Sequence, residues 1–234
     1  MIEIMEPVTP SQFSDMKVAA EALSRILTQN DIKFAFIGGF AVYLLGGGRS
    51  TLDIDVYVDM DINTIRERFK DIVCTADSRF VVDGLNVFFA PGGAKERIPI
   101  ETLALGSLGL PRKIVTFYPD DGTIPVLIPD VLILTKMKRA VQYIGSTRPQ
   151  SITKYKSDVY DIVHLLDWLN IHDHKIGFST YEGASPSRLY DAVGKMRNHW
   201  LSLGYDENVQ LLDDALNEED ALSVKCSAIQ LDGN

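Results

Sequence analysis

The sequence has few cysteines, no long apolar run and no excess of basic residues. Its two cysteines, Cys74 and Cys226, lie far apart without the close spacing of a metal site, which argues against a disulfide framework and fits a reducing compartment. The longest uncharged run, residues 34–48, has about 15 residues, whereas about 20 are needed to span a bilayer. The opening segment MIEIMEPVTPSQ lacks the basic and apolar regions of a secretory signal. We therefore expect a cytoplasmic protein with no membrane partner.

The shortage of basic residues also restricts the nucleic acids that the chain can bind. Lys and Arg total 23 against 32 Asp and Glu, a net charge of −9, whereas a broad phosphate-binding face needs many clustered cations. The charge is uneven, however. Residues 136–156 contain six basic and no acidic side chains, whereas residues 206–220 contain seven acidic and no basic ones. This pattern favours a nucleoside triphosphate (NTP) or one stretch of RNA over long duplex nucleic acid. A dinucleotide-binding fold is not indicated, because no G-x-G-x-x-G follows the first strand.

The order of the expected elements predicts an α/β (α+β) fold with a mixed β-sheet flanked by helices and a helical C-terminal part. With 46% hydrophobic and 24% charged residues, the composition is that of a globular protein. Strands dominate from 32 to 127 and helices follow, so we divide the chain into a core, 1–127, and a helical cap region packed on it, 128–234. Strands are expected at 34–37, 52–58, 79–82, 85–89, 98–105, 113–118 and 124–127, and helices at 11–29, 61–73, 129–144, 157–169, 185–202 and 206–217.

One stretch, FAFIGGFAVYLLGGGRSTLDIDVYVD from residue 34 to 59, brings glycines and carboxylates together. Because side chains alternate along a strand, Asp53 and Asp55 would share one face, with Cα atoms roughly 6.5–7 Å apart, while Leu52 would be buried on the other. Two carboxylates so close repel each other unless a cation lies between them, and their oxygens suit Mg²⁺. Gly38 and Gly39 lack Cβ atoms and would let backbone N–H groups approach an anion. The stretch therefore predicts a Mg²⁺–phosphate site.

These residues resemble the signature of the DNA polymerase β-like nucleotidyltransferase superfamily. The signature consists of Gly38-Gly39, a 13-residue gap and Asp53-x-Asp55, with Arg49 and Thr51 leading into the acidic strand. The longer string GGFAV…GGGRSTLDIDV is most similar to the abortive-infection (toxin-type) branch and to small stand-alone relatives. The resemblance implies that 1–127 is a catalytic core in which the glycine turn, Arg49 and Thr51 bind an NTP such as ATP. The two aspartates would hold two Mg²⁺ or Mn²⁺ ions.

The resemblance also implies a third metal-binding carboxylate from a neighbouring strand. Glu101, among apolar residues of the next suitable strand, is our choice, and Asp83, in a predicted turn, is the alternative. Pro99 cannot donate to a sheet ladder, which predicts an edge or a bulge near Glu101. Similarity to the toxin-type branch further implies that Lys136 and Lys156 bind the triphosphate, although a solvated helix face would explain both lysines as well.

Other polar and aromatic residues are expected to be structural. Asp158 and Asp161 would lie near the start of a helix capped by Ser157, where carboxylates favour the positive end of the helix dipole. The pair His172 and His174 is not expected to bind a metal. The large aromatic residues Tyr160, Trp168 and Trp200 are expected in the core.

The implied reaction is the transfer of a nucleoside monophosphate from an NTP to an acceptor hydroxyl, with release of pyrophosphate. Three acceptors remain open: a small molecule such as an aminoglycoside-like polyol, a tRNA 3′ end, or a protein hydroxyl. The alternative is a non-catalytic NTP-binding module or a degenerate nucleotidyltransferase that acts as a regulatory partner. The intact Gly-Gly and Asp-x-Asp favour the enzyme.

Overall fold

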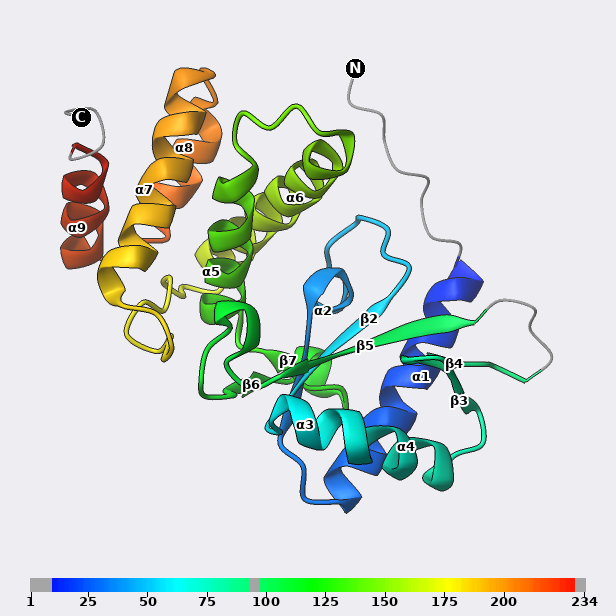
Figure 1. Ribbon diagram of the computed structural model, residues 1–234. Helices are drawn as coiled ribbons and strands as arrows, with labels where there is room; N and C mark the ends of the chain where they lie inside the picture. The colour runs from blue at the N-terminus through cyan, green and yellow to red at the C-terminus, as the bar shows by residue number, and fades with distance from the viewer. Residues whose placement is uncertain (1–9, 93–96, 230–234) are drawn as a thin grey trace. The chain divides into compact units, whose positions relative to one another are not determined.

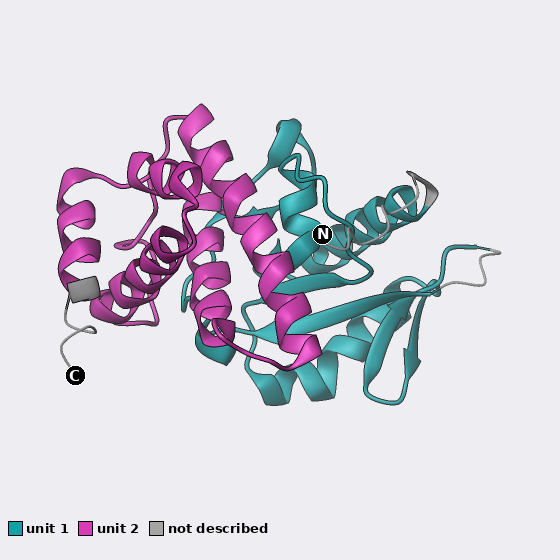
Figure 2. Cartoon of the chain, turned by 90° about the horizontal axis from the view of Figure 1, so that it is seen from above, with its two compact units in different colours: residues 1–127 teal, residues 128–234 magenta. Residues whose placement is uncertain are grey.

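The computed structural model describes residues 10–92 and 97–229 of the chain. The chain forms two compact units, residues 1–127 and 128–234, which Figure 2 draws in teal and magenta. None of the described helices combines the length and the low charge that a membrane span requires.

A seven-stranded mixed sheet forms the centre of the first unit (Figure 1). Its strand order is β3-β4-β5-β2-β1-β7-β6. The pairs β2–β5 and β1–β7 are parallel and the other neighbours antiparallel. The strands are β1 (Phe34–Ile37), β2 (Ile54–Val58), β3 (Phe80–Asp83), β4 (Asn86–Phe89), β5 (Ile98–Ala104), β6 (Thr116–Phe117) and β7 (Val126–Leu127). A mixed sheet with flanking helices confirms the predicted fold class.

The helices of the first unit lie mostly between β-strands that are adjacent in the sequence. They are α1 (Pro10–Gln29), α2 (Gly38–Leu44), α3 (Ile62–Thr64) and α4 (Lys70–Ala76), and a π-helical turn, Ile65–Phe69, joins α3 to α4. Helix α1 contacts α4 and buries one apolar stripe, which consists of Met16, Ala19, Ala20, Leu23, Ile26 and Leu27. Two short 3₁₀ segments, Ser107–Gly109 and Pro119–Asp121, occur in the loops. The predicted helix over 61–73 is therefore present but is interrupted by the π turn.

Strand β2 begins at Ile54, two residues later than predicted. Ile54, Val56 and Val58 are fully buried, as their alternation requires. The prediction that Leu52 is buried with them is wrong, since this side chain is 69% exposed. Leu52 and Asp53 form a bend before the strand, so the alternation of the strand does not extend to them.

The second unit is helical, as predicted. It contains α5 (Pro129–Ala140), α6 (Pro149–Ile171), α7 (Pro186–Ser202), α8 (Asp206–Asp214) and α9 (Glu218–Ile229), with a 3₁₀ turn, Val141–Tyr143, after α5. Helix α5 contacts both α6 and α7, and α7 contacts α8 and α9. Helices α5, α6 and α7 each begin with a proline, whose fixed φ suits the first helical position. The C-terminal helix α9 was not predicted.

Two predictions in the second unit are wrong. Helix α6 begins at Pro149 rather than after Ser157, so Asp158 and Asp161 lie in its interior and not at its N-terminus. The polar run 149–156 supports a helix because Pro149 can start one and most of the following side chains are exposed to solvent. Tyr160 is 51% exposed and is not a core residue, whereas Trp168 and Trp200 are buried as expected.

Candidate active site

Three carboxylates of the first unit converge at the sheet. Asp55 of β2 lies directly opposite Glu101 of the parallel strand β5, so the two side chains project from the same face. Asp53 reaches the same place from the bend before β2. One carboxylate oxygen from each of Asp53, Asp55 and Glu101 lies within 4.8 Å of the others. The structure thus brings together the three residues that were predicted as metal ligands.

This donor set fits a divalent cation. The three side chains formally carry three negative charges on closely spaced oxygens, and hard oxygen donors of this kind suit Mg²⁺ or Mn²⁺. Asp53 and Asp55 are half-buried while Glu101 is exposed, so the cluster is open to solvent on the Glu101 side. An approaching ligand can therefore reach the carboxylates.

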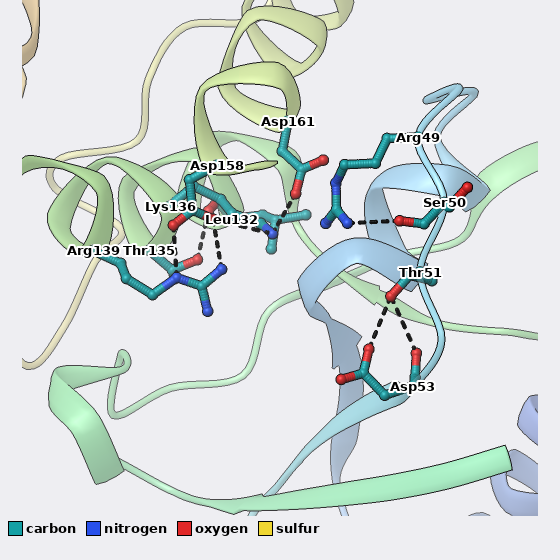
Figure 3. Close-up of polar contacts among 10 residues, drawn as sticks. All are labelled: Arg49, Ser50, Thr51, Asp53, Leu132, Thr135, Lys136, Arg139, Asp158 and Asp161. Atoms are coloured by element: carbon teal, nitrogen blue, oxygen red, sulfur yellow. Dashed lines mark hydrogen bonds and ion pairs between the residues drawn. The ribbon is translucent and has the colours of Figure 1, made fainter. Parts of the chain in front are cut away.

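Thr51 holds the first of these carboxylates through its hydroxyl group. Its Oγ1 atom lies 2.9 Å from Oδ1 of Asp53 and donates a hydrogen bond to it (Figure 3). Thr51 itself is only 6% exposed. The sequence predicts that Thr51 binds the nucleotide, whereas in the structure its hydroxyl donates a hydrogen bond to the carboxylate of Asp53.

The glycine pair lies against the side chains of the same site. A Cβ atom on Gly38 would be 1.8 Å from Oδ2 of Asp55, and Gly38 also has a positive φ of 71°. A Cβ atom on Gly39 would be 2.5 Å from Nη2 of Arg49 and 2.9 Å from Oγ1 of Thr51. Glycine is therefore required at both positions, because neighbouring side chains lie where a Cβ atom would be. At Gly38 the positive φ requires it as well.

Arg49 lies beside this turn and is held by the backbone. Its Nη1 donates a hydrogen bond of 2.7 Å to the carbonyl oxygen of Ser50, and its Nη2 lies over Gly39. Arg49 as a whole is half-buried. A cation is thus fixed next to the start of α2, where no described side chain caps the helix.

The structure distinguishes between the two candidates for the third carboxylate. Asp83 pairs with Asn86 at the tip of the β3–β4 hairpin and forms an ion pair of 4.0 Å with Arg97. It is not part of the carboxylate cluster, among the residues that the structure describes. Pro99, predicted at an edge or a bulge, lies in an interior strand but pairs only with Phe88 of β4, because the pairing of β5 with β2 begins at Ile100. The missing N–H therefore costs no ladder bond on the β2 side.

The predicted phosphate-binding lysines belong to the second unit. Lys136 of α5 is 2% exposed, and its Nζ lies 2.6 Å from Oδ2 of Asp161 and 3.7 Å from Oδ1 of Asp158 (Figure 3). Arg139 binds Asp158 with two hydrogen bonds, of 2.7 and 2.5 Å. Both aspartates are fully buried. The four side chains form a charge-balanced group that we call the α5–α6 ion-pair cluster.

Lys156, in contrast, is exposed in the interior of α6. The roles of Lys136 and Lys156 as phosphate ligands remain predictions. His172 stacks on Trp168, with ring centroids 4.0 Å apart, and its Nδ1 lies 2.7 Å from the carbonyl oxygen of Trp168. These contacts give His172 a structural role.

The sheet, the glycine turn and the convergent carboxylates are those of a nucleotidyltransferase. A family model described as the nucleotidyl transferase AbiEii toxin of a Type IV TA system matches residues 21–222. The chain belongs to this family and is a nucleotidyltransferase, which confirms the resemblance that residues 34–59 carry. No curated protein matches the sequence.

One solved structure supports the fold. An antigenic nucleotidyltransferase-like protein from Paracoccidioides brasiliensis superposes with a TM-score of 0.64 at 18% identity, covering 90% of this chain and 96% of that one. CdnC of E. coli MS115-1 with ATP gives a TM-score of 0.35 at 11% identity, covering 90% and 95% of the two chains. A CCA-adding enzyme with ATP gives 0.34 at 12% identity, covering 99% and 87%. Only the first of these likenesses is close enough to compare folds.

Proposed function

We propose that this nucleotidyltransferase uses a divalent metal ion to transfer a nucleoside monophosphate from an NTP to an acceptor hydroxyl, releasing pyrophosphate. The observation that carries the proposal is the convergence of Asp53, Asp55 and Glu101 within 4.8 Å. Asp53 and Asp55 would hold the metal ions, and Glu101 would share in holding one of them. Mg²⁺ or Mn²⁺ bound there would stabilise both the attacking and the leaving oxygens.

The side chains around the glycine turn would orient the triphosphate. The guanidinium of Arg49 offers a fixed positive charge beside Gly39, and the backbone at the start of α2 offers N–H groups. Because neither glycine carries a Cβ atom, Asp55, Arg49 and Thr51 can lie directly against this turn, and phosphate oxygens would bind beside them. ATP is one candidate for the NTP, and the base is not specified by these contacts.

The exposed carboxylate of Glu101 would receive the proton of the acceptor. The acceptor oxygen would form a bond to the α-phosphorus while the bond from the α-phosphorus to the bridging oxygen breaks, and the pyrophosphate leaves with the electron pair of that bond. The proton of the hydroxyl would pass to Glu101 and then to water. Such proton transfer by a positioned carboxylate contributes about 10²–10⁴-fold to a rate.

The acceptor is a small molecule, a tRNA 3′ end or a protein hydroxyl. The family description includes a toxin of a Type IV TA system, so we propose that the transfer restrains growth of the cell that makes the protein. We place the reaction in the cytoplasm, in keeping with Cys74 and Cys226, which are both free thiols.

The proposal is tested by incubating the purified chain with each α-³²P-labelled NTP, Mg²⁺ and a cell extract, and following the label into small-molecule, RNA and protein fractions. Label in one fraction, lost with EDTA and lost in the Asp53→Asn variant, is the expected result and names the acceptor class. Mg²⁺-dependent NTP binding without label in any fraction would instead favour a non-catalytic NTP-binding module.

A further inference from the structure

The three carboxylates of the candidate site are held in different ways. Asp55 and Glu101 lie in paired strands, where the register Asp55↔Glu101 fixes both backbones and the directions of both side chains. Asp53 lies outside the sheet, in the bend that precedes β2, and has no partner in the strand register. Its carboxylate therefore needs another constraint if it is to point constantly toward the other two.

The hydroxyl of Thr51 provides such a constraint. The hydrogen bond of 2.9 Å from Oγ1 fixes Oδ1 of Asp53, which restricts rotation of the carboxylate and leaves Oδ2 for other contacts. Thr51 is β-branched, so its own χ1 angle is restricted and the hydroxyl is held in place. With 6% of its surface exposed, Thr51 presents little of itself to a substrate.

Gly39 makes room for this arrangement. A Cβ atom there would lie 2.9 Å from Oγ1 and 3.0 Å from Cβ of Thr51, closer than ordinary van der Waals contact. The second glycine of the turn thus lets Thr51 pack against the turn while its hydroxyl is bonded to Asp53. The sequence features G-G and T-x-D are linked by this contact.

We propose that Thr51 is a positioning residue for the metal site, which orients the carboxylate of Asp53 toward Asp55 and Glu101, and is not itself a ligand of the triphosphate. The inference rests on the proposed function, because it requires that the three carboxylates bind a divalent ion. Outer-shell hydrogen bonds of this kind change metal affinity by about 10–100-fold.

The test compares Thr51→Val, which keeps the shape and loses the hydroxyl, with Thr51→Ser, which keeps the hydroxyl. Free Mn²⁺ is measured by electron paramagnetic resonance in a titration of the full-length protein. We expect Thr51→Val to weaken Mn²⁺ binding by about 10-fold or more and Thr51→Ser to bind within about threefold of the wild type. Thr51→Ala gives the same comparison if the valine variant does not fold, and circular dichroism checks each fold.

Binding of a fluorescent NTP in EDTA separates this role from direct phosphate contact. A positioning residue predicts that Thr51→Val leaves metal-free NTP affinity unchanged. Wild-type Mn²⁺ affinity in Thr51→Val, or a loss confined to NTP affinity, would overturn the inference. Asp53→Asn separates a failure of the positioning role from a failure of the metal site. If Asp53→Asn weakens Mn²⁺ binding and Thr51→Val does not, only the positioning role of Thr51 fails. If Asp53→Asn binds Mn²⁺ like the wild type, the metal site and the inference both fail.

Discussion

The two units each contain a cluster of carboxylates, and the clusters differ in how their charge is balanced. In the second unit Asp158 and Asp161 are fully buried, but each has a basic partner, Arg139 and Lys136, at 2.5–2.7 Å. In the first unit, one oxygen from each of three carboxylates lies within 4.8 Å of the others. Asp53 accepts its hydrogen bond from Thr51, whose hydroxyl is neutral.

This difference separates a structural cluster from one suited to a ligand. A buried carboxylate without a partner is costly, so the α5–α6 ion-pair cluster contains its own counter-charges. Carboxylates near solvent can tolerate repulsion, and a divalent cation relieves it. Removing a charge should therefore have opposite effects in the two places, with loss of activity in the first unit and loss of stability in the second.

The largest effect is expected for Asp53→Asn. Loss of a metal-binding carboxylate should reduce nucleotidyl transfer by at least about 1000-fold, equivalent to about 4 kcal/mol of transition-state stabilisation. Stability should not fall, because one of three repelling charges is removed. Transfer assays and thermal unfolding measure both effects. Asp59→Asn, an exposed aspartate just beyond β2, is the matched control and should retain activity. Equal transfer activity in Asp53→Asn and Asp59→Asn would show that the carboxylates of the first unit are not needed for activity, contrary to the comparison.

Asp161→Asn should show the opposite behaviour. Lys136 would remain buried without its partner at 2.6 Å, which typically costs about 3–5 kcal/mol. Urea unfolding measures the change in the free energy of unfolding. Asp167→Asn, exposed on the same helix, should change it by no more than about 0.5 kcal/mol. A stable Asp161→Asn protein with impaired NTP binding would instead indicate a functional role for this pair.

Gly38→Ala should affect both activity and stability. The new Cβ would be 1.8 Å from Oδ2 of Asp55 and would displace that carboxylate, so we expect at least about a 100-fold loss of transfer, or about 2.7 kcal/mol. The positive φ adds about 1–2 kcal/mol of strain. Gly84→Ala is the control, since Gly84 has a φ of 60° but nothing within 4 Å of the added Cβ. It should show the strain alone. Full activity in Gly38→Ala would show that Asp55 can adjust freely.

The smallest effect is expected for the ion pair between Arg197 and Asp213. Hydrogen bonds from Arg197, at 2.8 and 2.7 Å, lower the pKa of Asp213. Because the folded pKa is the lower one, this pair stabilises the fold above the unfolded pKa of about 3.9, and the stabilisation is lost as the pH falls through the folded pKa.

Arg197→Gln should therefore cost about 1 kcal/mol at pH 7, and the difference from the wild type should shrink below about pH 4. Urea unfolding curves at several pH values measure this difference in the free energy of unfolding. Lys195→Gln breaks the more exposed pair with Asp191 and should cost no more than about 0.5 kcal/mol. A pH-independent loss in Arg197→Gln would mean that packing and not charge is responsible.

The sequence predicted the centre of the first unit better than its edges. The run 34–37, the glycine pair and Asp53-x-Asp55 are local patterns, so β1, the turn and most of β2 followed from them. Leu52 was misplaced because the alternation was extended two residues beyond the first hydrogen-bonded pair. The choice between Glu101 and Asp83 depended on which strand lies beside β2, and that is a property of the sheet and not of local sequence.

The second unit shows where local patterns fail. Residues 149–156 look like a loop because they are polar, yet they form the solvent-exposed first turns of α6. The pairing of Lys136 with Asp161 joins residues 25 apart on two helices, and no spacing rule predicts it. The hydrogen bond from Thr51 to Asp53 was also missed, although the pattern T-x-D, with a hydroxyl two residues before a carboxylate, is a signal that could have indicated it.

The central claim is that Asp53, Asp55 and Glu101 bind a divalent metal ion. The most direct measurement is the anomalous scattering of Mn²⁺ in crystals grown with an NTP whose α,β-bridging oxygen is replaced by methylene, so that transfer cannot occur. We predict an anomalous peak between the three carboxylates, with the phosphates of the nucleotide beside Gly38 and Gly39. A bound nucleotide with Mn²⁺ elsewhere, or with no peak between the carboxylates, would contradict the account.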